Sequence, residues 1–298
     1  MKRLLLTIAS LLVTVAACAQ DPHAEHQMAT TTLSTANTTV SQDWARKKVE
    51  GSPRHHEWVN VKAGTRTVSA FVVYPEVKTK APAVVVIHEI FGMSDWVQML
   101  ADEVAEAGNI AIAPDLLSGM GPNGGGTSSF ADGTAVGKAI RDLPPDQITA
   151  DLNAVADYVA KLPAASGKVA VTGFCWGGTQ SFRFATNRPS LSAAYVFYGT
   201  GPESPDDIAK IKAPVYGFYA GNDARIGATL PKTIELMKAA GKTFEPVTYE
   251  GAGHGFMRAG ETPPPPTDAD QKVRDAYAGN KKARDDAWVR WKGLLKKL

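Results

Sequence analysis

Short apolar segments alternate with amphipathic helical patterns along most of this chain, from about residue 57 onward. The run AVVVIH (83–88) is uninterrupted and rich in β-branched residues, which is typical of a strand buried on both faces. Apolar residues at helical spacing follow over 95–107, and Gly108 ends that pattern. This alternation predicts a mostly parallel sheet with helices on both faces. We find no internal repeat and no second domain boundary, so a single α/β domain is expected over 57–298.

Other segments complete this plan. The run TVSAFVVY (67–74) alternates with period two, which predicts an early edge strand. Further strands are expected at 109–114, 168–173, 195–199, 213–220 and 243–250, and further helices at 146–161, from about 177, and at 269–297. The glycine-rich segment 119–133 is expected to be either a mobile flap or a plain surface loop.

Composition and charge narrow the class of protein only slightly. The chain has 298 residues, of which 44% are hydrophobic and 21% are charged, as in an ordinary globular protein. Its formal net charge is +2, and no basic stripe with interleaved aromatic residues is present. We therefore expect no nucleic-acid partner.

The first nineteen residues have the pattern of an export signal. Met1-Lys2-Arg3 is a positive segment, and a short apolar run ending in small residues follows it. Two cleavage sites are compatible with this pattern. Val15-Ala16-Ala17-Cys18 resembles a bacterial lipobox in which Cys18 is lipidated, whereas Ala17-Cys18-Ala19 fits cleavage that releases a soluble protein. We expect a periplasmic protein or a membrane-anchored bacterial lipoprotein, with membrane contact only through the anchor.

Residues 20–56 contain many Ser and Thr residues and little apolar periodicity, which predicts a flexible, solvated linker. Four of the six histidines lie in this segment: His23, His26, His55 and His56. A metal site is conceivable there, but no cysteines or fixed scaffold support it. Solvated histidines are the favoured interpretation, and no metal is expected.

Cys175 lies in GFCWGG (173–178), between a predicted strand and a predicted helix. This is the pattern of the nucleophile turn of α/β hydrolases, in which small neighbours are needed because the turn is crowded and strained. The chain has two cysteines, and the other is Cys18. Because Cys18 is either lipidated or removed with the signal, Cys175 has no partner for an intramolecular disulfide. An inert buried thiol is the alternative to a nucleophile.

A nucleophile in this fold needs a histidine and an acid later in the chain. His254, in GAGHGF, is the one histidine that follows Cys175. For the acid, Asp223 in YAGNDARI directly follows a predicted strand, although it could instead be a turn-capping aspartate. Three rivals in helical or pre-helical stretches are Asp206, Asp207 and Glu235.

Four motifs, HEIFG, GFCWGG, GNDARI and GAGHGFMR, occur in this order and together resemble the dienelactone hydrolase family, the cysteine branch of the α/β hydrolases. The resemblance extends from about residue 57 to the C-terminus. It implies that Cys175, Asp223 and His254 form a catalytic triad. It also implies that Glu89 holds the resting thiol and releases it when substrate binds.

The resemblance assigns three further residues. The backbone N–H groups of Trp176 and Ile90 would form an oxyanion hole, and Arg258 would bind a substrate carboxylate. Where the family often has an aromatic residue and an arginine after Pro-Asp-Leu, this chain has Leu117-Ser118-Gly119. The second half of a carboxylate clamp is therefore missing.

These features predict an exported, monomeric hydrolase that cleaves small esters or lactones through an acyl-thioester on Cys175 and needs no cofactor. A broad-specificity esterase or thioesterase is the alternative within the same class. Two alternatives outside it are a catalytically silent binding protein and a thiol redox sensor.

Overall fold

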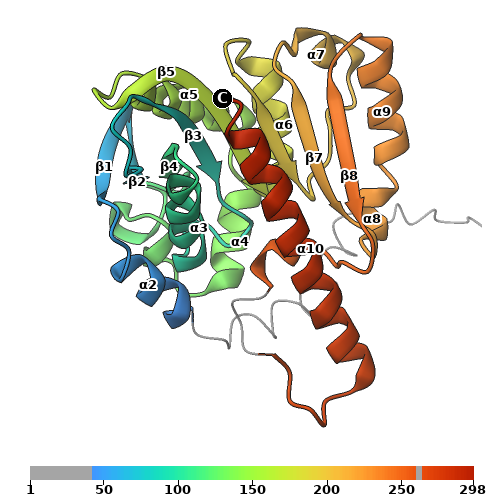
Figure 1. Cartoon of the computed structure of the whole chain (residues 1–298). Helices are drawn as coiled ribbons and strands as arrows, with labels where there is room; N and C mark the ends of the chain where they lie inside the picture. Colours follow the sequence, from blue (N-terminus) through green and yellow to red (C-terminus); the bar gives the residue numbers. More distant parts are fainter. Residues whose placement is uncertain (1–41, 260–263) are drawn as a thin grey trace, which may run out of the picture. The chain divides into compact units, whose positions relative to one another are not determined.

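The structure is a computed structural model that describes residues 42–259 and 264–298. The predicted signal sequence, Cys18 and residues 20–41 of the predicted linker lie outside these ranges. The described part forms one eight-stranded sheet flanked by helices (Figure 1).

The sheet has the strand order β1-β2-β4-β3-β5-β6-β7-β8. The strands are β1 (His56–Ala63), β2 (Arg66–Val73), β3 (Ala81–Ile87), β4 (Ile110–Pro114), β5 (Ala165–Phe174), β6 (Ala194–Phe197), β7 (Val215–Ala220) and β8 (Phe244–Tyr249). Strand β2 pairs antiparallel with both of its neighbours, and all other pairs are parallel. The predicted single α/β domain with a mostly parallel sheet is confirmed.

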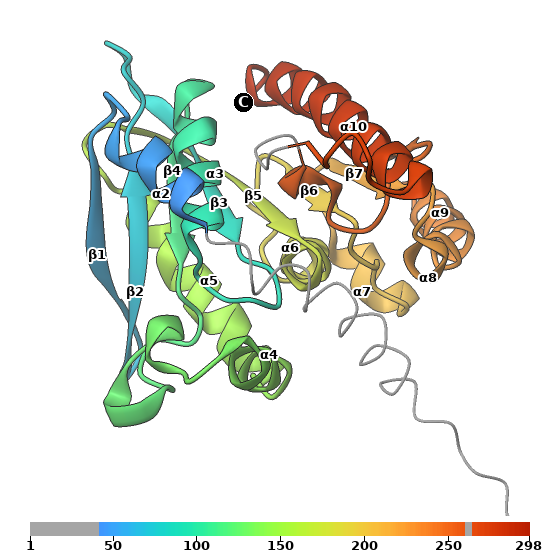
Figure 2. The ribbon, with the colours of Figure 1, turned by 90° about the horizontal axis from the view of Figure 1, so that it is seen from below.

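Helices cover both faces of the sheet, as Figure 2 shows from below. One face carries α4 (Gly133–Arg141), α5 (Pro145–Ala160), α6 (Trp176–Asn187), α7 (Pro205–Lys210) and α9 (Leu230–Ala239). The other face carries α2 (Asp43–Glu50), α3 (Asp95–Glu106) and α10 (Gln271–Leu295). Strands such as β3 have both faces buried in this way, which explains their uninterrupted apolar sequence.

Helix α2 lies within the segment predicted as a flexible linker, so for residues 43–50 that prediction is wrong. Ala45 and Val49 are one helical turn apart and are both buried in the apolar cluster that contains α3. After the helix, Arg54 donates two hydrogen bonds to the carboxylate of buried Asp102, from Nε to Oδ1 at 2.9 Å and from Nη2 to Oδ2 at 2.6 Å. Two apolar residues in a short polar helix are too weak a pattern to predict alone, and burial against α3 stabilises it.

The predicted edge strand at 67–74 is not at the edge. It corresponds to β2, which lies between β1 and β4, whereas β1 is the edge strand. Most of β1 is only half-buried or exposed, with Val61 as its one buried residue. Because so few of its residues are buried, the sequence of β1 lacks the regular alternation of apolar and polar residues that would predict a strand, as expected at the edge of a sheet.

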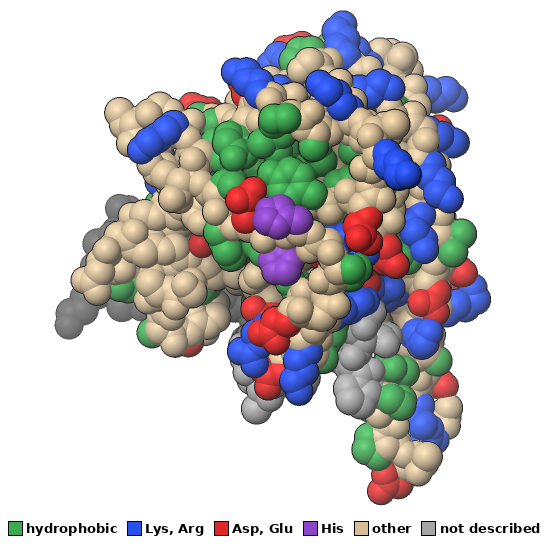
Figure 3. All heavy atoms as spheres, turned by 60° about the vertical axis from the view of Figure 1, so that its left-hand side comes forward, with side chains coloured by type: hydrophobic (Ala, Val, Ile, Leu, Met, Phe, Trp, Pro, Cys, Tyr) green, Lys and Arg blue, Asp and Glu red, His purple; other side chains and the backbone are tan. Residues whose placement is uncertain are grey.

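Charged side chains of both signs are interspersed over the face shown in Figure 3, beside a broad area of uncharged side chains and backbone. Within 42–259 and 264–298, no helix has the length and apolarity that crossing a membrane requires.

Candidate active site

Cys175 lies at the turn between β5 and α6, at the carboxyl edge of the parallel strands. Its backbone has φ 55° and ψ −117°, a region that residues with a side chain rarely adopt. The surrounding backbone holds it there: the Cys175 N–H donates to Phe197 O at 3.0 Å, and Cys175 O accepts from Thr179 N at 3.2 Å. The strained turn that the sequence predicts is therefore present.

Glycines make this turn possible because backbone segments approach each other closely. A Cβ atom on Gly173 would collide with the carbonyl of Gly177, and one on Gly177 would collide with the carbonyls of His88 and Ile87. A Cβ atom on Gly178 would collide with Phe197 O. The end of β3 and the start of α6 thus come together only where side chains are absent.

His254 and Asp223 come together from the loops after β8 and β7. His254 Nδ1 lies 2.5 Å from Asp223 Oδ2. The other oxygen, Oδ1, accepts from Ile226 N at 3.2 Å and caps the short helix α8 (Ala224–Gly227). One carboxylate thus contacts the histidine and also caps a short helix.

The rival acids lie elsewhere. Asp207 pairs with Lys210 and Glu235 pairs with Lys232, both as exposed ion pairs within one helix. Asp206 is exposed on α7.

The environment of His254 favours its charged form. Burial alone would lower the pKa of His254, but the hydrogen bond with Asp223 and the neighbouring Cys175 sulfur raise that pKa to about 10. Burial would raise the pKa of Asp223, and the bond with His254 outweighs this and lowers it. The Nε2 atom of His254 is buried without a hydrogen-bond partner among the described residues. A proton on this nitrogen is therefore available to a group beside Cys175.

Glu89 follows β3 and is 2% exposed. Its Oε2 lies 3.3 Å from Arg258 Nε, and its Oε1 lies 3.5 Å from the hydroxyl of Tyr198. The sequence predicts a bond between Glu89 and the resting thiol, whereas in this structure the carboxylate pairs with Arg258 instead. Arg258, on the turn Phe256–Arg258, also lies over the Phe91 ring, 5.1 Å from its centroid.

Tyr198 is a site residue that the sequence analysis missed. It follows β6, is fully buried, and has a positive φ of 39°. Its ring meets His254 edge to face at 5.0 Å between centroids. Burial raises the pKa of Tyr198 well above its ordinary value, so the phenol stays protonated. The one available signal was a tyrosine at the carboxyl end of a strand followed by glycine, as in YVFYG.

Two backbone N–H groups, those of Trp176 and Ile90, lack a backbone acceptor among the described residues. Trp176 is the first residue of α6, so its N–H has no intrahelical acceptor. Ile90 N also donates to no carbonyl within the described ranges. The Trp176 ring stacks on buried His88 at 5.5 Å and 12°. Burial lowers the pKa of His88, which keeps the ring neutral.

Hydrogen bonds through Thr127 hold the glycine-rich segment 119–133, called the strap below, against Asp115 and Met93. Asp115 accepts three hydrogen bonds, from Leu117 N at 3.1 Å, Thr127 N at 2.8 Å and Thr127 Oγ1 at 2.7 Å. Thr127 Oγ1 in turn accepts from Met93 N at 3.1 Å, just beyond Ile90. The same hydroxyl occupies the space that a Cβ atom on Gly92 would need, where φ is +70°. The segment is thus an ordered strap rather than a free loop.

Among the described residues, no group of three or more His, Cys, Asp and Glu side chains is placed to hold a metal ion. His55 and His56 lie at the start of β1, where His55 is largely exposed and His56 packs on Phe71.

Comparison with known proteins identifies a family and several solved structures that this chain resembles. The model of the dienelactone hydrolase family matches residues 68–298. A Salmonella typhi protein named "Putative carboxymethylenebutenolidase" is 35% identical over 187 residues, which are 59% of this chain and 67% of that one. A Saccharolobus solfataricus protein of the same name is 30% identical over 266 residues, covering 78% and 94%. The crystal structure titled "Putative Dienelactone Hydrolase" from Klebsiella pneumoniae superposes with a TM-score of 0.68 at 25% identity, covering 83% of this chain and 100% of that one.

Proposed function

This chain belongs to the dienelactone hydrolase family, and from that premise we propose that Cys175, His254 and Asp223 form the catalytic triad of a hydrolase for small esters or lactones. The contact of 2.5 Å between His254 Nδ1 and Asp223 Oδ2, beside a cysteine held at positive φ, is the observation that carries the proposal. A buried acid, an imidazole and a strained nucleophile turn are the parts that acyl transfer requires.

The first half-reaction uses the proton on His254. Its raised pKa keeps the imidazole protonated at neutral pH while sulfur attacks as the thiolate. A bond forms between Cys175 Sγ and the carbonyl carbon, and the carbonyl π electrons move to oxygen. The tetrahedral intermediate then collapses, the bond to the alcohol oxygen breaks, and His254 donates its proton to that oxygen. An acyl-thioester on Cys175 and a free alcohol result.

The second half-reaction hydrolyses the thioester. Neutral His254 takes a proton from water as the water oxygen attacks the acyl carbon. Collapse of the second intermediate breaks the carbon–sulfur bond and returns the electron pair to Cys175. Asp223 orients the ring in both halves and stabilises the imidazolium. A carboxylic acid leaves, and the Cys175 thiolate and the protonated His254 are regained.

The N–H groups of Trp176 and Ile90 are proposed as the oxyanion hole. They donate to the carbonyl oxygen only when it carries the charge of the tetrahedral intermediate, and one such donor is worth about 3 kcal/mol of barrier. The strap through Thr127 supports the backbone that carries Ile90, because it bonds three residues further on, at Met93.

Glu89 and Arg258 are proposed to respond to a substrate carboxylate. Before substrate binds, Glu89 would hold the Cys175 thiol, and it would take the thiol proton when the sulfur is released as the thiolate. The pairing of Glu89 with Arg258 in this structure supports a link by which a substrate carboxylate on Arg258 acts on Glu89. A second candidate is a broad esterase or thioesterase. It is favoured by Leu117-Ser118-Gly119, which offers Arg258 no partner arginine for a carboxylate.

We further propose that the protein acts as an exported monomer on a small-molecule substrate, either periplasmic or anchored through lipid on Cys18. The N-terminal pattern of the sequence supports this location. Labelling with radioactive palmitate in a bacterial host, compared with Cys18→Ser, tests the anchor. Incorporation that persists in the variant would contradict it.

Steady-state hydrolysis by the wild type, Cys175→Ala and Cys175→Ser tests the function. Dienelactone, an uncharged lactone of similar size and short acyl esters serve as substrates. We expect turnover by the wild type and a loss of at least three orders of magnitude in both variants. Trapping a thioester by rapid acid quench would identify Cys175 as the acylated residue. No turnover of any substrate by a reduced, folded wild type would overturn the proposal.

A further inference from the structure

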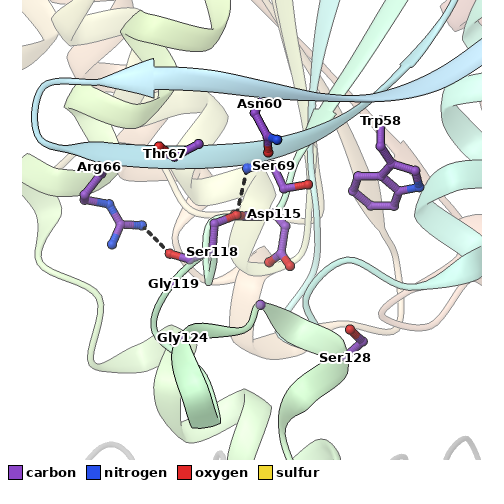
Figure 4. Close-up of a pocket in the computed structure, with 11 residues that line it drawn as sticks. Trp58, Asn60, Arg66, Thr67, Ser69, Asp115, Ser118, Gly119, Gly124 and Ser128 are labelled. Carbon is purple, nitrogen blue, oxygen red and sulfur yellow. Dashed lines mark hydrogen bonds between the residues drawn. The ribbon is translucent and has the colours of Figure 1, made fainter.

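A hollow lies at the carboxyl end of β4, between the β1–β2 strands and the strap segment 119–133 (Figure 4). Its volume is about 620 Å³, within the range of about 300–1,000 Å³ that small-molecule sites occupy. None of the residues proposed for catalysis lines it.

The charged groups at its walls are already engaged. Arg66 pairs with buried Asp151 at 3.3 Å and donates to Ser118 O at 3.1 Å. The Asp115 carboxylate accepts from Leu117 and Thr127. Since neither charge is left without a partner, the described residues that line the hollow offer no free cation for an anionic ligand and no free anion for a cationic one.

The groups that remain available are neutral. The Asn60 amide and the hydroxyls of Ser69 and Ser128 have no partner in the part of the chain that the structure describes. An amide and a hydroxyl each both donate and accept hydrogen bonds. Asn60 is paired with Ser69 across β1 and β2, so both side chains lie on one face. In Figure 4 these two residues lie between Arg66 at one end of the hollow and Trp58 at the other.

Trp58 supplies a flat apolar wall. It is 49% exposed, an unusual degree for tryptophan, and lies two residues before Asn60 on the same face of β1. Its ring is steadied by Phe71 on the paired strand, at 5.4 Å between centroids. An aromatic face beside neutral donors and acceptors suits a ligand with a flat apolar surface and a polar edge.

We propose that this hollow binds a sugar residue, a neutral ring whose C–H face packs on Trp58 and whose hydroxyl groups bond with Asn60, Ser69 and Ser128. A ring of this kind has both donors and acceptors around its edge, matching the neutral groups of the wall. A purely apolar ligand would leave these groups unpaired at a cost. The site is independent of the proposed ester chemistry and lies on the same carboxyl edge of the sheet.

Isothermal titration of the full chain with sugars tests the site. The probes are glucose, galactose, N-acetylglucosamine, cellobiose and chitobiose. We expect at least one of them to bind, and Trp58→Ala to weaken its affinity by about tenfold or more because the stacking surface is lost. Trp58→Phe should retain part of the affinity, and Asn60→Ala should weaken binding without changing the melting temperature.

Two matched variants separate the possible outcomes. Lys62→Ala changes the same face of β1, but Lys62 does not line the hollow and contacts it only through the Thr67 hydroxyl at 2.7 Å, so binding should change far less than in Trp58→Ala. Cys175→Ala should bind sugar like the wild type, so that a failed hydrolase proposal would not affect this one. The proposal is overturned if no probe binds, if Trp58→Ala binds as well as Lys62→Ala, or if inorganic phosphate occupies the site in place of sugar.

Discussion

Arg258 Nε lies 3.3 Å from Glu89 Oε2, and both side chains are largely buried. Arg258 also lies over Phe91, so its position is fixed by a charge on one side and a ring on the other. Neither residue is a solvated surface group. A substrate carboxylate that binds Arg258 must compete with Glu89 for it.

This competition gives the first prediction. Arg258→Gln should raise KM for a carboxylate-bearing lactone by about tenfold or more, the worth of one charge-assisted hydrogen bond. An uncharged lactone of the same size should keep its KM, since it makes no ionic contact with Arg258. Initial rates on the two lactones measure the difference. An equal rise for both substrates would exclude a clamp role.

Asp223→Asn should separate the two tasks of this residue. The amide can still cap α8 through its oxygen, so the free energy of unfolding should fall only by the share that the ionic bond to His254 contributes. It cannot stabilise the His254 imidazolium, so kcat/KM should fall by about 10²- to 10⁴-fold. Denaturant unfolding and steady-state kinetics measure the two effects. A stability loss without a kinetic loss would indicate that Asp223 is only a cap.

The raised pKa of His254 predicts how stability depends on pH. The pKa of the His254 imidazole is about 6.5 in the unfolded chain and about 10 in the folded protein. Protonation of His254 therefore stabilises the folded state. This contribution to the free energy of unfolding is complete below the unfolded-state pKa and is lost as pH rises through the folded-state pKa. Urea unfolding at a series of pH values should show stability falling across that window. In His254→Gln this fall should be smaller, and an identical profile would contradict the assignment.

Two glycine substitutions form a matched pair. Gly177→Ala should destabilise the fold by about 3 kcal/mol, because its Cβ atom collides with the backbone of β3 and the residue after it. Gly293→Ala lies in α10 with nothing within 4 Å of the added atom, and should stabilise by about 0.5–1 kcal/mol. Thermal unfolding of both variants provides the measurement. Similar shifts would mean that the approach of β3 and α6 is not tight.

Thr127 is predicted to be a positioning residue. Thr127→Val keeps the shape but removes the hydroxyl that bridges Asp115 and Met93 N. The segment that carries Ile90 would loosen, so kcat should fall by about tenfold, the worth of one hydrogen bond, with little change in KM. Thr127→Ser keeps the hydroxyl and should restore kcat. A valine variant with normal kcat would assign the strap a purely structural role.

The parts of this molecule that the sequence predicts are those set by local pattern or by chain order. The buried strands, the long helices and the turn at Cys175 all follow from periodicity and from glycine spacing. His254 was identified because no other histidine follows Cys175. The catalytic roles of these residues stay predictions until kinetics tests them.

What the sequence does not predict depends on contacts between distant segments. Tyr198 becomes a site residue only because β6 pairs with β5, which brings the Tyr198 ring into contact with His254. Helix α2 needs burial against α3, and the strap depends on a single threonine reaching Met93 across 34 positions. The pairing of Glu89 with Arg258 likewise joins residues that lie 169 positions apart in the sequence, so no local sequence pattern predicts it.

Helix α10 also bears on the order in which the protein can be completed during synthesis. Trp291 is fully buried and packs on Phe197 at 5.0 Å and on Phe174, the residue before Cys175, at 5.9 Å. Since α10 extends to Leu295, a ribosome must make the chain as far as this helix before these rings are covered. A growing or truncated chain would expose them and be prone to aggregation. The packing next to Cys175 is therefore completed only after α10 is made, so a chain that lacks α10 is expected to be inactive.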